Sequence, residues 1–444
     1  MYHDGCGAVQ IVLHLTIQLA VILGTCRLVS LVLERLGQTK VASEMVAGLM
    51  LGPSLFGLVA PHASEWLFPR APVVLASGAV EPNPSMAILG AIARVGLVLY
   101  MFLVGAELDL SEVRGRAKSA ALVSASGIAA PFVLGALSSI FLRRAEPGLF
   151  GTDVAPSTAA LYLGVAMSIT AFPMLARILH ERGLARGRLG TLTLAAGATD
   201  DVIAWCLLAL LLAWTKHDPK IGALAVFGSI AYVAVVHFVV RRWILKRLAA
   251  HAERLGRASH AAIVTLLALL FAGAFVTDAI GVHAVFGAFV LGTALPRGVL
   301  SREMFDKLEP ITVSVLVPVF FVNAGLGTSI GLLDRGSLWV IVGGLTAVAV
   351  IGKLGACAIA ARASGESWRD ALTVGTLMNT RGMMGLIILG IGLEQKVLGA
   401  TLYTMLVLVA VVTTLATSPL LSVLLKPATA SDPDRVSAKG TTGG

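Results

Sequence analysis

Two neighbouring carboxylates lie inside a long apolar stretch of the sequence. Asp200 and Asp201 stand in LAAGATDDVIAWCLLALLLAW, and two bases, Lys353 and Arg381, lie in other apolar segments. At the centre of a membrane helix each charge costs about 2.5–3.5 kcal/mol on insertion scales, so such groups are usually paired or functional. These four residues therefore predict a charged site in the interior of a membrane protein.

The two carboxylates must serve different partners, because neighbouring residues of a helix point about 100° apart. We expect Asp200 to pair with Lys353. We expect Asp201, with Asp200 beside it, to face a water-filled cavity and bind a monovalent cation, Na⁺ or K⁺. A proton and a cation that compete for one carboxylate would be exchanged. Hard cations prefer oxygen ligands, and the side chains expected to complete the shell, together with freed backbone carbonyls, are Ser168, Thr170 and Thr199.

Two alternatives remain open for the buried charges. Asp200 and Lys353 could form a fixed salt bridge that only locks two helices together. Arg381 could bind substrate, although its position beside a helix-breaking string favours a second role. In that role it balances the dipole at the C-terminus of a half-helix.

Helix-breaking strings lie close to the middle of two apolar segments. SITAFP occupies residues 168–173, and Pro173 has no backbone N–H to donate. MNTRGM occupies residues 378–383, and Gly382 weakens a helix. If both helices unwind, free carbonyls and half-helix ends meet at the membrane centre, where they can bind ions. The alternative is a pair of tolerated kinks.

The composition is that of a membrane protein. Of 444 residues, 57% are hydrophobic and 13% charged, and the mean hydropathy is +0.88, whereas soluble domains average about 25% charged residues. An ordinary soluble enzyme, a disordered chain and a disulfide scaffold are excluded. The four cysteines lack metal-ligand spacing, so no cofactor is expected. The net charge of +9 is explained by cytoplasmic loops, so nucleic acid is not an expected partner.

Thirteen segments are apolar and long enough, at about 20 residues, to span a bilayer. If the N-terminus is outside, the inside loops and the inside ends of the spans hold 23 of the 34 Lys and Arg residues, and the outside loops and outside ends hold seven. This bias predicts an outside N-terminus and a cytoplasmic C-terminus in the cell (inner) membrane. The segments are 9–34, 41–60, 86–108, 117–142, 156–180, 189–214, 219–240, 258–278, 280–297, 308–330, 336–363, 369–391 and 398–426.

Three short patterns recur in the same order in the two halves of the chain. AGLMLG at 47–52 resembles GAFVLG at 287–292, LYMFLVGAEL at 99–108 resembles PVFFVNAGL at 318–326, and SITAFP resembles MNTRGM. Each partner lies seven helices further along the chain, so the two partners point in opposite directions. Inverted repeats around a midplane site are typical of alternating-access transporters. The predicted fold is an all-α polytopic membrane protein of about thirteen helices, with two inverted six-helix repeats and crossed discontinuous helices.

The same pattern divides the chain into regions. Residues 1–426 form the predicted transporter domain, and residues 427–444 form a short disordered cytoplasmic tail, because they are polar. The inverted repeats cover about 9–214 and 258–426, and 219–240 is the predicted linker helix between them.

Six strings carry a family resemblance: LGPSLFGL (51–58), GLVLYMFLVGAELDL (96–110), SITAFPMLARIL (168–179), ATDDVIAWCLLAL (198–210), GVHAVFGAFVLG (281–292) and NTRGMMGLIILGIG (379–392). They resemble the monovalent cation:proton antiporters, which include bacterial sodium/proton antiporters and plant cation/proton exchangers. The resemblance implies a homodimer in membrane lipid. Each protomer would have a scaffold-like dimerisation domain and a mobile core that carries the crossed helices and the aspartates.

The resemblance also bears on the charge that is moved. In this family an Asp-Asp pair with a buried lysine goes with electrogenic exchange, and Asp200, Asp201 and Lys353 match that pattern. One departure is Gly385, because many members similar around NTRG carry a glutamate there.

The predicted function is secondary antiport, the exchange of Na⁺ or K⁺ for protons by alternating access, and not an enzyme activity. The alternative is a sodium-coupled symporter of an organic anion on the same architecture, which needs an anion site at half-helix N-termini. An intramembrane aspartyl protease needs two carboxylates that face one water from separate elements, whereas Asp200 and Asp201 are adjacent.

Overall fold

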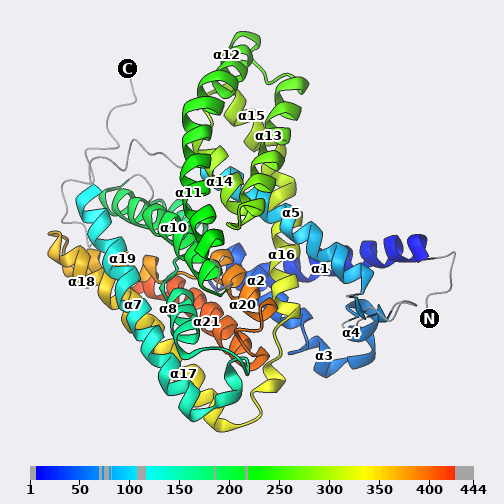
Figure 1. Ribbon diagram of the computed structural model, residues 1–444, viewed down its shortest axis with the longest axis vertical. Coiled ribbons are helices and arrows are strands. Elements are labelled where there is room, and N and C mark those ends of the chain that lie inside the picture. Colours follow the sequence, from blue (N-terminus) through cyan, green and yellow to red (C-terminus); the bar gives the residue numbers. More distant parts are fainter. Residues whose placement is uncertain are drawn as a thin grey trace.

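The chain is a nearly all-helical bundle in a computed structural model (Figure 1). Within the part of the chain that the structure describes, the strands are β1 (Val73–Val74) and β2 (Val80–Glu81), an antiparallel pair with Val73 opposite Glu81. In the same part, nine helices are long and apolar enough to cross a membrane. The predicted all-α polytopic fold is confirmed. The described residues are 7–69, 73–74, 80–81, 83–107, 117–184, 187–215 and 219–425, so the predicted tail lies outside them.

Local sequence sets where several helices begin. The side chains of Thr39, Ser259 and Ser367 accept hydrogen bonds from N–H groups in the first turns of the helices that follow them, as N-cap residues do. Pro156 opens its helix at a position where a missing N–H is tolerated. The helices of the first half are α1 (Gly7–Arg35), α2 (Lys40–Leu51), α3 (Phe56–Val59), α4 (Pro61–Leu67), α5 (Pro84–Glu107), α7 (Ala117–Ala145), η2 (Pro147–Leu149), α8 (Pro156–Ser168), α9 (Phe172–Glu181) and α10 (Arg188–Thr215).

Three helices of the second half contain π-helical stretches, η3, η4 and η6. Such stretches occur frequently at functional sites, and η6 contains Lys353. The helices of the second half are α11 (Pro219–Ala234), η3 (Val235–Leu245), α12 (Lys246–Leu255), α13 (His260–Ala279), α14 (Ala284–Ala294), α15 (Val299–Ile311), η4 (Thr312–Leu316), α16 (Val317–Leu326), η5 (Ile330–Leu332), α17 (Gly336–Val350), η6 (Ile351–Gly355), α18 (Ala356–Ala363), α19 (Trp368–Met378), α20 (Met383–Glu394) and α21 (Ala400–Leu424).

Each of the thirteen predicted segments corresponds to one helix or to one interrupted helix. The predicted linker helix, 219–240, is longer in the structure and continues from Pro219 through η3 and α12 to Leu255. At 1.5 Å per residue it measures about 55 Å, which exceeds the roughly 30 Å of a bilayer core. Together with α13 and α15 it forms the projecting end at the top of Figure 1.

The repeated motifs pack against one another in exchanged pairs. The AGLMLG motif of α2 lies against α16, where a Cβ at Gly48 would stand 2.5 Å from the carbonyl oxygen of Phe321. The LYMFLVGAEL motif of α5 lies against α14, where a Cβ at Gly105 would stand 2.2 Å from the carbonyl oxygen of Phe289. Small residues permit such close backbone approach between membrane helices. In both pairs the first motif of one half meets the second motif of the other, as inverted repeats require.

Two groups of helices can be distinguished by their packing. The helices α1, α2, α5, α13, α14 and α16 form the first group, and α7, α8, α10, α18 and α19 form the second. The helix α21 contacts members of both groups, among them α2 and α19. Asp200 and Asp201 lie in the second group, and Arg381 lies in the helix break that follows α19. Lys353 lies in η6, which contacts α7, α18 and α19 of the second group.

Candidate ion-binding site

The two predicted helix breaks face one another. Residues 169–171 separate α8 from α9, and residues 379–382 separate α19 from α20. The backbone N–H of Ala171 donates to the carbonyl oxygen of Thr380 over 3.0 Å, which joins the two breaks. The prediction of crossed discontinuous helices is confirmed.

Pro173 and Gly382 do not interrupt helices in the way that the sequence predicts. Pro173 is the second residue of α9, so it opens a half-helix where a missing N–H is tolerated instead of interrupting a helix. Gly382 is the N-cap residue of α20, in extended backbone with a φ of −170°. A Cβ at this position would stand 3.0 Å from the Cβ of Ala171. Gly382 therefore allows the two breaks to approach each other closely.

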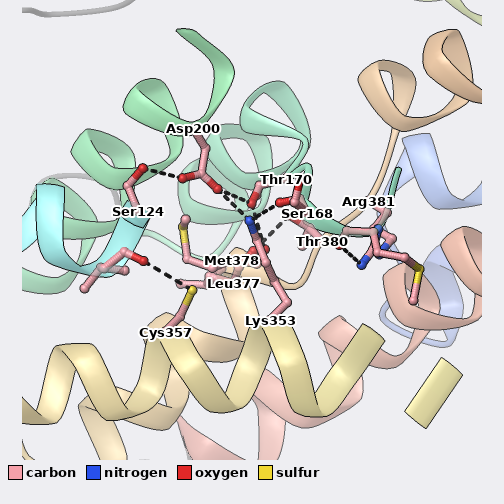
Figure 2. A network of polar contacts seen from close by, with 12 residues as sticks. Ser124, Ser168, Thr170, Asp200, Lys353, Cys357, Leu377, Met378, Thr380 and Arg381 are labelled. Atoms are coloured by element: carbon pink, nitrogen blue, oxygen red, sulfur yellow. Dashed lines mark hydrogen bonds and ion pairs between the residues drawn. The ribbon is translucent and has the colours of Figure 1, made fainter. Parts of the chain in front are cut away.

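Asp200 and Lys353 form a buried ion pair (Figure 2). The Nζ atom of Lys353 lies 2.7 Å from Oδ2 of Asp200, and each side chain is 1% exposed. The same ammonium donates to the carbonyl oxygen of Ser168 over 2.5 Å, at the end of α8. The predicted partners are therefore in contact, and a helix terminus shares the positive charge.

The helix α7 leaves room for the lysine. Gly127 faces the η6–α18 segment, and a Cβ at Gly127 would stand 3.7 Å from Nζ of Lys353 and 2.4 Å from Sγ of Cys357. Four residues further along α7, a Cβ built on Gly352 would meet Pro131 at 3.1 Å. One face of α7 therefore packs directly on the segment that carries the ammonium.

Replacing Gly127 with alanine is expected to overpack this contact and destabilise the protein by about 1–3 kcal/mol. The added methyl group would lie 2.4 Å from a sulfur atom that is fully buried. Cys357→Ala removes that sulfur, so the double variant Gly127→Ala/Cys357→Ala should recover most of the loss. Thermal unfolding of the purified variants measures the effect. A double variant no more stable than Gly127→Ala would show that the clash lies elsewhere.

Two hydroxyl groups complete the surroundings of Asp200. Ser124 of α7 donates to Oδ1 over 2.6 Å, and Thr170 of the α8–α9 break donates to Oδ2 over 2.7 Å (Figure 2). Thr170 also lies 3.1 Å from the carbonyl oxygen of Met378. The structure thus attaches Thr170 to Asp200, whereas the sequence placed it in the shell of Asp201. Ser124 was not predicted, because a serine in an apolar helix carries no pattern that points to a partner 76 residues away.

Asp201 stands beside this network, and no side chain among the described residues forms a hydrogen bond with its carboxyl. Its side chain is 0% exposed, and neither carboxyl oxygen makes a hydrogen bond with the residues that the structure describes. The backbone N–H of Phe172, at the start of α9, interacts with the carboxyl but does not reach hydrogen-bond geometry. The prediction that Asp201 faces a water-filled cavity differs from this structure, in which the carboxyl is occluded.

The other two predicted shell residues bond within their own helices. The hydroxyl of Ser168 donates to the carbonyl oxygen of Val165 over 2.9 Å, and that of Thr199 donates to the carbonyl oxygen of Ala195 over 2.8 Å. Ser168 takes part in the site through its backbone, because its carbonyl oxygen accepts from Lys353. Freed carbonyls at the break are therefore used by the ion pair in this structure.

Arg381 caps the C-terminus of α8. Its Nη1 and Nη2 atoms donate to the carbonyl oxygens of Ala166 and Met167 over 3.0 and 2.7 Å. The backbone of Arg381 is held in turn by the hydroxyl of Thr414, which accepts from its N–H and donates to its carbonyl. Cations are favourable at a helix C-terminus, so Arg381 and Lys353 together offset the negative end of α8.

A cavity of about 500 Å³ opens between α5, the α13–α14 turn, α16 and α20. An ion pair crosses it, since Nη2 of Arg94 lies 3.1 Å from Oε1 of Glu394. Asp278 and His283 also line the cavity. On its α20 side the cavity reaches Leu386, one turn from the helix break.

Comparison with known proteins shows which family this chain belongs to. The model of the family described as "Sodium/hydrogen exchanger, transmembrane" matches residues 19–426. The Na(+)/H(+) antiporter NhaS4 of Synechocystis is 38% identical over 401 residues, which cover 90% of this chain and 94% of that protein. Cation/H(+) antiporter 15 of Arabidopsis thaliana is 34% identical, over 93% of this chain but 48% of its own length. The chain thus spans about half the length of that plant relative.

A solved structure shares the fold. The sodium proton antiporter MjNhaP1 from Methanocaldococcus jannaschii matches with a TM-score of 0.61 and 13% identity, over 93% of this chain and 97% of that one. The predicted family and the predicted class, a transporter and not an enzyme, are both confirmed. The chain belongs to the sodium/hydrogen exchanger family of transmembrane proteins.

Proposed function

We propose that this chain exchanges a monovalent cation, Na⁺ or K⁺, for protons by alternating access, with Asp201 as the group that carries each of them in turn. The observation that supports this most is the contrast between two adjacent carboxylates. Asp200 accepts from an ammonium and two hydroxyls, while Asp201 has no hydrogen bond within the described residues and is fully buried. Burying a carboxylate without a partner costs several kcal/mol. Binding of either a proton or a cation to Asp201 would offset this cost and is therefore favoured.

We also propose which oxygen atoms surround the cation. Oxygen ligands for a monovalent cation at Asp201 would come from the backbone of the two breaks and from the hydroxyls of Ser168, Thr170 and Thr199, each of which keeps lone pairs while it donates elsewhere. Asp200 would act mainly through its charge, because its own oxygens are already occupied.

The occluded carboxyl fits one stage of an alternating-access cycle. A transporter must close its site to both sides between openings, and Asp201 is closed here. The cavity at Arg94 and Glu394 offers a route from one side, because it descends along α20 toward the break. A Cβ at Gly390, which lines this cavity, would have no neighbour within 4 Å, so α20 is loosely covered at that position. We propose that motion of the second helix group against the first helix group extends this route to Asp201.

The lipid environment, orientation and assembly are proposed on other grounds. Large apolar side chains are exposed along the helices, such as Leu28 at 67%, Phe227 at 70% and Phe238 at 76%, and lipid would cover them. We propose residence in the cell (inner) membrane with the N-terminus outside and the C-terminus in the cytoplasm, from the bias of basic residues. A homodimer built on the first helix group, with residues 1–426 as the transporter domain, is proposed by analogy with the family.

Exchange of two protons for one cation would move one net charge in each cycle. Moving one charge across 100 mV is worth about 2.3 kcal/mol, so a membrane potential would drive the exchange. The buried Asp200–Lys353 pair supports this proposal, because it supplies a second ionisable unit beside Asp201. No observation favours the sodium-coupled symport of an organic anion.

Transport by the purified full chain in proteoliposomes tests the proposal. Vesicles that enclose a pH-sensitive dye and hold an imposed pH gradient receive Na⁺, K⁺ or, as a control, choline. Na⁺ or K⁺ should dissipate the gradient and choline should not, and clamping the membrane potential should change the rate. Vesicles that keep their gradient with every alkali cation would overturn the proposed function.

A further inference from the structure

We infer that Ser124 of α7 is a positioning residue for cation transport, because its hydroxyl fixes Asp200 so that Lys353 keeps its place beside Asp201. The inference deepens the proposed cation:proton exchange and rests on it. Ser124 is 0% exposed, and its hydroxyl lies 2.6 Å from Oδ1 of Asp200. Figure 2 shows the serine on the side of the carboxylate that the lysine does not reach.

The two oxygens of the Asp200 carboxylate accept hydrogen bonds from different donors. Thr170 and Lys353 both donate to Oδ2, each over 2.7 Å, while Oδ1 receives its hydrogen bond from Ser124. A buried anionic oxygen without a donor is costly. If the serine hydroxyl were lost, the ammonium of Lys353 would be the charged donor best able to replace it, and would turn from the carbonyl of Ser168 toward Oδ1.

Such a shift of the ammonium matters because Asp201 responds to both charges. Asp201 interacts electrostatically with Asp200 and with Lys353. A cation bound at Asp201 is attracted by the first charge and repelled by the second, and both interactions change steeply with distance in a buried site. The position of the pair therefore sets the affinity of Asp201 for a cation, although Ser124 does not touch that carboxyl in the structure.

The packing of α7 holds the serine in place. The thiol of Cys357 lies 3.7 Å from the carbonyl oxygen of Val123, and Gly127 brings the next turn of α7 against the same segment. These contacts flank Ser124 along one helix face, since residues three and four apart are neighbours there. The helix therefore presents the hydroxyl to Asp200 from a rigid support.

A second serine on α7 provides a matched control. Ser139 is also 0% exposed, but its hydroxyl donates to the carbonyl oxygen of Ala136 in its own helix over 2.7 Å. Ser124→Ala and Ser139→Ala remove the same atom from the same helix at the same burial. An effect of general loosening of α7 would appear in both variants, whereas an effect through Asp200 would appear in the first alone. Ser124→Thr keeps a hydroxyl and serves as the rescue variant.

The test measures the dependence of exchange on cation concentration in proteoliposomes at one fixed pH. In Ser124→Ala the apparent KM for the cation should rise about tenfold, equivalent to about 1.4 kcal/mol, with a much smaller change in maximal rate. Ser139→Ala should keep the KM of the wild type, and Ser124→Thr should return it to within about threefold, or about 0.65 kcal/mol.

Two outcomes would count against the inference in different ways. If the wild type exchanges cations and Ser124→Ala has the same KM as Ser139→Ala, the positioning role is wrong and the proposed function stands. If the wild type shows no exchange with any alkali cation, the proposed function fails and the inference fails with it.

Discussion

Asp201→Asn is expected to abolish cation-dependent proton exchange, with a loss of at least about 100-fold in rate. An amide cannot take up and release a proton, and it lacks the charge that offsets the dehydration of a bound cation. The substitution is nearly isosteric, and the native carboxyl makes no hydrogen bond with the described residues. The variant should therefore fold, and its defect should be confined to transport. Dissipation of an imposed pH gradient by Na⁺ or K⁺ in proteoliposomes gives the rate.

A matched control lies on the same helix. Thr193 of α10 is 0% exposed, and its hydroxyl donates to the carbonyl oxygen of Leu189 within the helix over 2.7 Å. Thr193→Val should exchange cations at close to the wild-type rate, and both variants should elute from a sizing column as the wild type does. Full exchange by Asp201→Asn would remove this residue from the mechanism.

Lys353→Met is expected to destabilise the protein strongly, by about 3–5 kcal/mol, because it leaves a buried carboxylate without its counter-charge. Asp200 would keep the two hydroxyl donors, Ser124 and Thr170, but no cation among the residues described as bonding to it. The double variant Asp200→Asn/Lys353→Met removes both charges. It should recover most of the stability, since the amide oxygen can accept from one hydroxyl and the amide nitrogen can donate to the other. Thermal unfolding of the single and double variants measures how much stability is lost and how much is recovered.

The same double variant separates a structural role of the ion pair from a transport role. If the pair only locks two helices, the double variant should recover stability and voltage-driven exchange together. We expect the double variant to recover its stability. Its exchange should no longer depend on membrane potential, because the second ionisable unit is gone. A Lys353→Met variant as stable as the wild type would show that the buried Asp200 does not depend on Lys353 as its counter-charge.

The sequence predicts the charged centre well because so few groups can occupy it. Within apolar segments, Asp200 has few possible counter-charges, so its pairing with Lys353 follows from the cost of burying either charge alone. Arg381 lies beside a break, and the negative end of a half-helix is the natural place for its guanidinium. The crossed breaks were predicted from Pro173 and Gly382, although the structure uses one to start a helix and the other to allow close approach.

Other features depend on information that no short pattern contains. Whether Thr170 reaches Asp200 or Asp201 is decided by the rotation of α10 relative to the break, which a spacing of residues leaves open. Ser124 reaches Asp200 only because α7 packs across α10. The burial of Asp201 is a property of the packed structure, which the spacing of residues in the sequence does not report. The linker helix continues to Leu255, and its last part, α12, packs on α15 beyond the expected membrane span.

The release of protons on cation binding tests most directly whether one buried carboxyl serves both ions. Purified protein in weakly buffered detergent solution is titrated with NaCl or KCl, with choline chloride as the control for ionic strength, and a pH indicator records released protons. The wild type should release protons with a saturable dependence on Na⁺ or K⁺, and Asp201→Asn, which lacks both the titrating carboxyl and the charge that holds the cation, should show no saturable release. An unchanged release from Asp201→Asn would contradict the assignment of this carboxyl as the shared site.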